Sequence, residues 1–112
     1  MMYLTIGLFA LAAVLGLSIL IKWLTKKEAS RAVIYSHGIA AAAALVLLIV
    51  YAVQSPGNFP KASIILFILT ALGGFYMFYL DLKKQNSPIA IAVIHALLAV
   101  SGLVALLIFV FA

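Results

Sequence analysis

Long apolar runs, separated by short polar segments, make up most of the chain. An α-helix of about 20 apolar residues crosses the roughly 30 Å hydrocarbon core of a bilayer. Runs of this length cover residues 2–21, 31–53, 62–80 and 88–112. The pattern therefore predicts an all-α integral membrane protein, a single domain over residues 1–112, in which four transmembrane helices form an up-down-up-down bundle.

The polar segments predict where the helices end. Pro56 and Pro60 stop the second helix, because proline cannot continue a helix from its interior. Ser87 is expected to cap the fourth helix, with Pro88 in its first turn. Because all three connections are short, successive helices should be neighbours in space.

Composition supports the membrane assignment and removes several chemistries. Of the 112 residues, 69% are hydrophobic and 8% are charged, and there is no cysteine. Disulfides, thiolate metal sites and a cysteine nucleophile are thereby excluded. The predicted spans contain no Ser-His-Asp arrangement, phosphate loop or carboxylate pair, so hydrolysis and phosphoryl transfer have no support. The first apolar run lacks a basic leader and continues to Ile21, which favours a retained helix over a signal peptide.

The net charge of +5 is concentrated in two of the connections. By the positive-inside rule, those two connections are expected to be cytoplasmic, with both termini outside an inner (plasma) membrane. Basic residues beside spans favour the lipid bilayer and its anionic headgroups as a partner, and no nucleic-acid partner is expected. Asp81 is expected to pair with Lys84. The basic residues in the first and third connections are Lys22, Lys26, Lys27, Arg31, Lys83 and Lys84; Lys61 lies on the other side.

The chain also matches itself at an offset of 58 positions. The most informative matches pair glycine, lysine and histidine residues, because apolar matches arise easily in apolar sequence. These matches are Gly16/Gly74, Lys26/Lys84 and His37/His95, accompanied by Ile6/Ile64 and Phe9/Phe67. The offset predicts two repeats, residues 1–54 and 59–112, which enter the membrane in the same direction and are related by a pseudo-two-fold axis along the membrane normal.

The second and fourth helices each carry one histidine in their interior, His37 and His95. Ionisable residues at membrane depth are costly and usually face the bundle interior, a cavity or a ligand. In the predicted bundle these two helices lie on one diagonal, so the imidazoles should face each other. Five to six residues from the basic end correspond to about 7 to 9 Å of depth, a layer that Gly16 and Gly74 should share.

This arrangement predicts a haem b bis-ligated by His37 and His95 as the metal ligands, one from each repeat. Gly16 and Gly74 would let the first and third helices approach the macrocycle. The haem propionates would lie near cationic side chains that neutralise them. Those side chains are Lys22, Lys26, Arg31, Lys83 and Lys84.

In general design the pattern resembles the membrane four-helix b-type cytochromes. A haem in this layer predicts electron transfer near the cytoplasmic face. The location in the bilayer favours quinol or oxygen species as exchange partners, with a redox partner protein as the alternative. The pattern does not decide between a membrane oxidoreductase and an electron carrier.

Two other classes stay open. The histidines could be packing residues of a structural or assembly subunit, hydrogen-bonded to a backbone carbonyl, Ser36 or Ser101. A small metal or proton permease is the third class, although no Asp, Glu or Cys in a predicted span completes a four-ligand ion site unless two chains combine in a homodimer. Length and helix count are similar to those of small multidrug transporters, but residues 1–21 lack the essential glutamate of that family.

Overall fold

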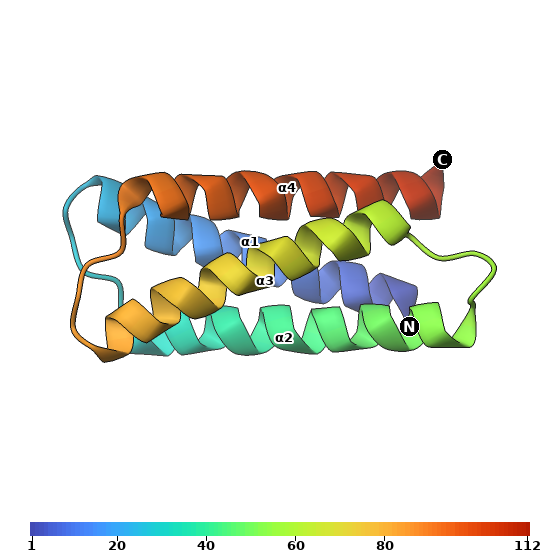
Figure 1. Ribbon diagram of the computed structural model, residues 1–112, viewed down its shortest axis with the longest axis horizontal. Helices are drawn as coiled ribbons and strands as arrows, with labels where there is room; N and C mark the ends of the chain where they lie inside the picture. Colours follow the sequence, from blue (N-terminus) through green and yellow to red (C-terminus); the bar gives the residue numbers. More distant parts are fainter.

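The computed structural model describes all 112 residues and contains four α-helices that run alternately up and down (Figure 1). Each helix is long and apolar enough to cross a membrane. The molecule measures 44 × 20 × 19 Å, and its long axis matches the roughly 40–45 Å of a bilayer with its headgroups. The prediction of an all-helical chain with four candidate spans is confirmed. The helices are α1 (Met2–Leu24), α2 (Arg31–Gln54), α3 (Lys61–Leu82) and α4 (Ile89–Phe111).

The connections after α1 and α3 reverse the chain in the same way. Lys26 has φ 58° and Lys84 has φ 57°, the left-handed conformation that often ends a helix. The Lys27 N–H donates to the Lys22 carbonyl at 2.7 Å, and the residues 58 positions later, Gln85 and Leu80, repeat this bond at 2.9 Å. The two turns therefore share one geometry, and both helices extend slightly past their predicted ends.

The starts of α2 and α4 differ in their caps. Ser30 Oγ accepts a hydrogen bond from the Ala32 N–H at 3.2 Å, so α2 has a side-chain cap. The predicted cap at Ser87 is wrong, because Pro88 itself occupies the N-cap position and α4 has no side-chain cap. Ser87 thus lies one residue too early to reach the first free N–H groups of the helix.

The helices pack in a ring of neighbours. The closest packing is within each hairpin, between α1 and α2 and between α3 and α4. Between the hairpins, α1 lies against α4, and α2 makes a smaller contact with α3. The remaining pairs, α1 with α3 and α2 with α4, lie on the diagonals without backbone contact, as the sequence analysis expects.

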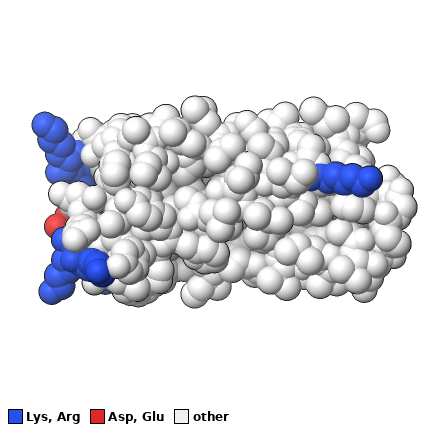
Figure 2. Space-filling model, in the orientation of Figure 1, with Lys and Arg blue, Asp and Glu red and all other residues white.

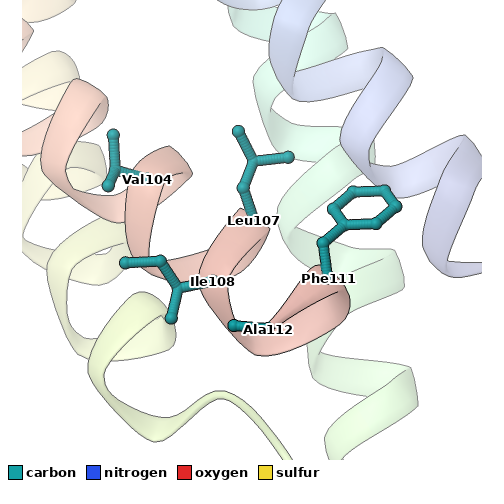
Figure 3. A pocket seen from close by; sticks show the side chains of 5 residues that line it. All are labelled: Val104, Leu107, Ile108, Phe111 and Ala112. Atoms are coloured by element: carbon teal, nitrogen blue, oxygen red, sulfur yellow. The ribbon is translucent and has the colours of Figure 1, made fainter.

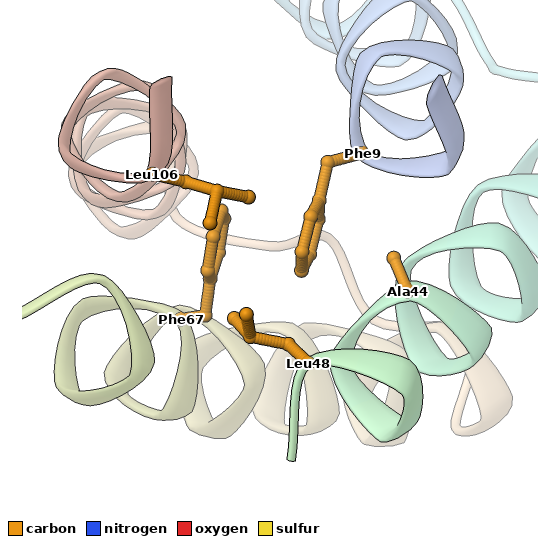
Figure 4. Packing of buried hydrophobic residues seen from close by; sticks show 5 residues of the cluster. All are labelled: Phe9, Ala44, Leu48, Phe67 and Leu106. Atoms are coloured by element: carbon orange, nitrogen blue, oxygen red, sulfur yellow. The ribbon is translucent and has the colours of Figure 1, made fainter. Parts of the chain in front are cut away.

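The core lies where the diagonals cross, away from the basic end. The rings of Phe9 and Phe67 stack with their centroids 3.9 Å apart and their planes 3° apart. Figure 4 shows them enclosed by Ala44, Leu48 and Leu106, which are completely buried. Ala44 on α2 and Gly102 on α4 leave room for the two phenyl rings, because a Cβ atom on Gly102 would lie 3.1 Å from the ring of Phe67.

The surface is apolar. Only 16 of the 112 residues are buried, and large apolar side chains such as Val14, Phe75 and Leu97 are more than half exposed. Soluble monomers rarely expose apolar areas of this extent, so the surface favours contact with lipid.

Charged side chains gather at the end that carries the α1–α2 and α3–α4 turns (Figure 2). Asp81 Oδ2 accepts a hydrogen bond from Arg31 Nη1 at 3.2 Å, which joins α3 to α2. The predicted pairing of Asp81 with Lys84 is wrong. The left-handed turn takes Lys84 off the helix, so the i,i+3 relation on one helical face no longer applies.

Candidate functional site

His37 is held by the neighbouring helix of its own hairpin. Its Nδ1 lies 2.7 Å from the carbonyl oxygen of Ala12 in α1. Because a carbonyl only accepts, Nδ1 must be the protonated donor. In the neutral ring this leaves a free lone pair on Nε2.

His95 repeats the arrangement in the second hairpin. Its Nδ1 lies 2.8 Å from the carbonyl oxygen of Thr70 in α3. Ala12 and Thr70 are 58 positions apart, as are the two histidines. Both imidazoles are therefore anchored through the same nitrogen to equivalent backbone atoms.

Glycine makes both anchors possible. A Cβ atom built on Gly16 would lie 2.8 Å from His37 Cε1, and one built on Gly74 would lie 3.1 Å from His95 Cε1. Any larger residue would push the imidazole away from the carbonyl four residues earlier. The histidines and glycines that were predicted to share one layer do meet, and each imidazole lies against its glycine.

The backbone carbonyls of Ala12 and Thr70, which accept the hydrogen bonds of the two histidines, were not predicted from the sequence. A backbone carbonyl has no side-chain signature, so only an indirect signal existed. That signal is the glycine 21 positions before each histidine, four residues after the carbonyl that the histidine reaches. This spacing places glycine and carbonyl one helical turn apart on one face of the helix.

The two rings face each other across the α2–α4 diagonal. Their centroids are 6.2 Å apart and their planes are inclined by 73°. A metal ion held between two Nε2 atoms by bonds of about 2.0 Å would place the ring centres roughly 6 Å apart, once the ring radii are added. The observed separation of the ring centroids matches this distance.

The Nε2 atoms are the available donors. Neither forms a hydrogen bond to the protein, and no buried side-chain nitrogen or oxygen lacks a partner, so neither Nε2 is sealed by protein atoms. No third His, Cys, Asp or Glu completes a metal-binding group. The donor set fits a cofactor that brings its other ligands with it, as haem does.

The predicted propionate partners all lie at the basic end, nearer the surface than the imidazoles. Lys22 follows Gly16 by six residues, which is about 9 Å along α1. Lys22, Lys26 and Lys84 are exposed, and Arg31 is engaged with Asp81 and Tyr35. The structure therefore places these cations above the histidine layer without bringing them to the rings.

Two apolar hollows lie on the outer surface, and neither is lined by a histidine. One is formed by α4 at its carboxyl end (Figure 3), and the other by α2 near its middle. Neither contains a polar side chain that could orient a ligand, so both are features of the apolar surface. The linings are Val104, Leu107, Ile108, Phe111 and Ala112 in the first, and Ile39, Ala42, Ala43, Val46 and Leu47 in the second.

Comparisons with known proteins find no matching protein-family model, no matching curated protein and no matching solved structure.

Proposed function

We propose that the chain is a membrane-embedded b-type haem protein whose axial ligands are His37 and His95. The observation that carries the proposal is the pair of unpartnered Nε2 atoms on rings 6.2 Å apart. Bound haem supplies one-electron redox chemistry, and the chain supplies ligands, orientation and an apolar surrounding.

The hydrogen bonds behind the rings support a ligand role. Metal-bound histidines commonly donate their other N–H to a carbonyl or carboxylate, which fixes the tautomer and makes the ligating nitrogen more basic. His37 and His95 both do this, towards Ala12 and Thr70. The layer below each ring is lined by Ala41 and Ala99, one turn further along the same helical faces, where larger side chains would exclude a macrocycle.

The basic end supports the placement of the propionates. Lys26 and Lys84 both adopt a left-handed conformation that costs about 1–2 kcal/mol for a residue other than glycine. Glycine would adopt this conformation at a lower free-energy cost. Lysine at these two positions therefore contributes a positive charge and does not stabilise the turn. A pair of positive charges here suits propionates that point towards the membrane surface.

The finer topology belongs to the same proposal. Two repeats, residues 1–54 and 59–112, each supply one histidine; the equal turn geometry and the 58-residue spacing of the anchors support this duplication. The basic turns face the cytoplasm and both termini face outside, in the inner (plasma) membrane. Electrons are then exchanged near the cytoplasmic face, with a quinone in the bilayer or with a redox protein.

A structural role is the second candidate, and the same anchors favour it. Each imidazole fills a glycine gap and hydrogen-bonds a neighbouring helix, so each ties its hairpin together without any ligand. The two candidates differ in what they require of Nε2. A ligand role needs that atom, whereas a packing role needs only the Nδ1–H donor.

Asparagine variants separate the two roles. The side-chain amide of asparagine can place a donor near the position of Nδ1, but it has nothing at the position of Nε2. We expect the chain purified from haem-replete cells to show Soret and reduced α bands that His37→Asn and His95→Asn both lose while keeping the fold. A colourless parent chain would instead refute the haem and leave the structural role.

A further inference from the structure

The two interfaces between the hairpins are not alike. By the 58-residue offset, the α2–α3 interface corresponds to the α4–α1 interface. Yet α1 and α4 pack along a longer contact, while α2 and α3 touch little. One side of the bundle is therefore the weaker seam.

The two helices of this weaker seam, α2 and α3, are joined at both ends. At one end the connection from Ser55 to Pro60 joins α2 to α3 covalently. At the other end, Arg31 Nη1 donates to Asp81 Oδ2 at 3.2 Å, and it lies 3.3 Å from the hydroxyl of Tyr35. The rings of Tyr35 and Phe78 pack at a steep angle of 75°, with their centroids 5.8 Å apart.

This cluster has no counterpart on the other side of the bundle. The positions equivalent to Arg31, Tyr35 and Asp81 are Ile89, Val93 and Trp23. The Arg31–Asp81 pair is also the only side-chain hydrogen bond or ion pair between the two hairpins, because each histidine and Ser63 bonds within its own hairpin. Side-chain hydrogen bonds and ion pairs between the hairpins are thus confined to the α2–α3 interface, which is the less closely packed of the two.

The pair lies directly above the candidate site. His37 follows Arg31 by six residues on α2, which is about 9 Å along the helix. Gly74 precedes Asp81 by seven residues on α3, which is about 10 Å. Parting α2 from α3 at this end would therefore open the histidine layer to the side of the bundle.

We propose that the α2–α3 seam is the lateral entrance through which a planar cofactor with a largely apolar macrocycle passes from the lipid to the histidines, and that Arg31–Asp81 is the clasp that holds it closed. The identity of the cofactor rests on the proposed haem function, whereas the clasp rests on contacts within the chain alone. The α1–α4 interface stays shut as the cofactor enters.

Matched pairs of spin labels test the clasp without any cofactor. The chain has no cysteine, so two introduced cysteines carry the only labels. Ile39→Cys with Phe75→Cys spans the α2–α3 seam. Leu97→Cys with Leu17→Cys spans α4 and α1 at the equivalent positions, and all four side chains are more than half exposed. Distances measured by pulsed electron paramagnetic resonance then report each seam separately.

Asp81→Asn is the perturbation, because it removes one charge of the clasp and leaves the proposed propionate partner Arg31 in place. Asp81→Glu keeps the charge, and Glu28→Gln removes the other acidic charge of the chain from an exposed turn without touching the clasp. Loss of an exposed ion pair shifts an equilibrium by about two- to fivefold. We expect Asp81→Asn to raise the population of longer Ile39–Phe75 distances by this factor and to leave the Leu17–Leu97 distances unchanged.

Haem uptake by the cofactor-free protein should accelerate by the same factor in Asp81→Asn and stay at the parent rate in both controls. Unchanged label distances in Asp81→Asn would overturn the clasp. Changed distances with an unchanged uptake rate would overturn the entrance. Changed distances in a chain that binds no haem would overturn the proposed function and leave the clasp standing.

Discussion

Alanine substitutions at the glycines provide a graded test of how tightly the imidazoles are seated. At Gly16 the new methyl would lie 2.8 Å from His37 Cε1, so the ring would have to move by about 0.6 Å to reach an ordinary contact of 3.4 Å. That shift would stretch the 2.7 Å bond to the Ala12 carbonyl to about 3.3 Å, beyond the usual range for a hydrogen bond.

The expected free-energy change combines three contributions. Overpacking costs about 1–3 kcal/mol, and loss of the hydrogen bond costs about 1 kcal/mol. Replacing a helical glycine by alanine returns about 0.5–1 kcal/mol. Gly16→Ala should therefore lower the free energy of unfolding by about 1–3 kcal/mol. Gly74→Ala should lower it less, because its methyl would stand 3.1 Å from His95.

Two glycines of the same helical type serve as controls. A Cβ at Gly7 or Gly38 would meet nothing within 4 Å, so these alanine variants should gain the helix-propensity contribution alone. Unfolding in mixed micelles, followed by circular dichroism during a titration with sodium dodecyl sulfate, measures all four variants. If Gly16→Ala is as stable as Gly7→Ala, the close seating of His37 against α1 is refuted.

Three further tests address the turn, the core and the orientation. Lys26→Gly removes the cost of holding a lysine in the left-handed conformation, so it should raise the free energy of unfolding by about 1 kcal/mol in the same titration. A decrease would contradict the left-handed conformation of Lys26. Phe9→Ala removes a buried ring and should lower the free energy of unfolding by about 3–5 kcal/mol. Phe75→Ala removes a ring that is 69% exposed and should lower it far less. Equal losses of stability would contradict the central position of the Phe9–Phe67 stack. In intact cells, a membrane-impermeant thiol reagent should label Asn58→Cys and spare Lys27→Cys, and the reverse pattern would invert the proposed orientation.

The helices and the histidine layer were predictable because both follow from distances along the chain. A run of about 20 apolar residues sets the length of a span, and equal spacing puts His37 and His95 at equal depth. The short connections then leave only one ring of neighbours, which places the two histidine helices on a diagonal.

The details that sequence could not supply depend on atoms or registers that residue types do not encode. The acceptors for the histidines are backbone carbonyls, so Ala12 and Thr70 have no side-chain signal. Asp81 pairs with Arg31, 50 positions away, because the helices bring them together and the turn removes Lys84. Ser87 misses its cap by one position, a shift that local sequence does not resolve.

The haem content of the purified chain decides whether His37 and His95 share one haem iron. The chain isolated from haem-replete cells should contain one haem per polypeptide, with sharp Soret and reduced α bands, and both His37→Asn and His95→Asn should lose it while retaining their helical circular dichroism. A folded parent chain that stays colourless under these conditions would show that the two histidines share no haem iron.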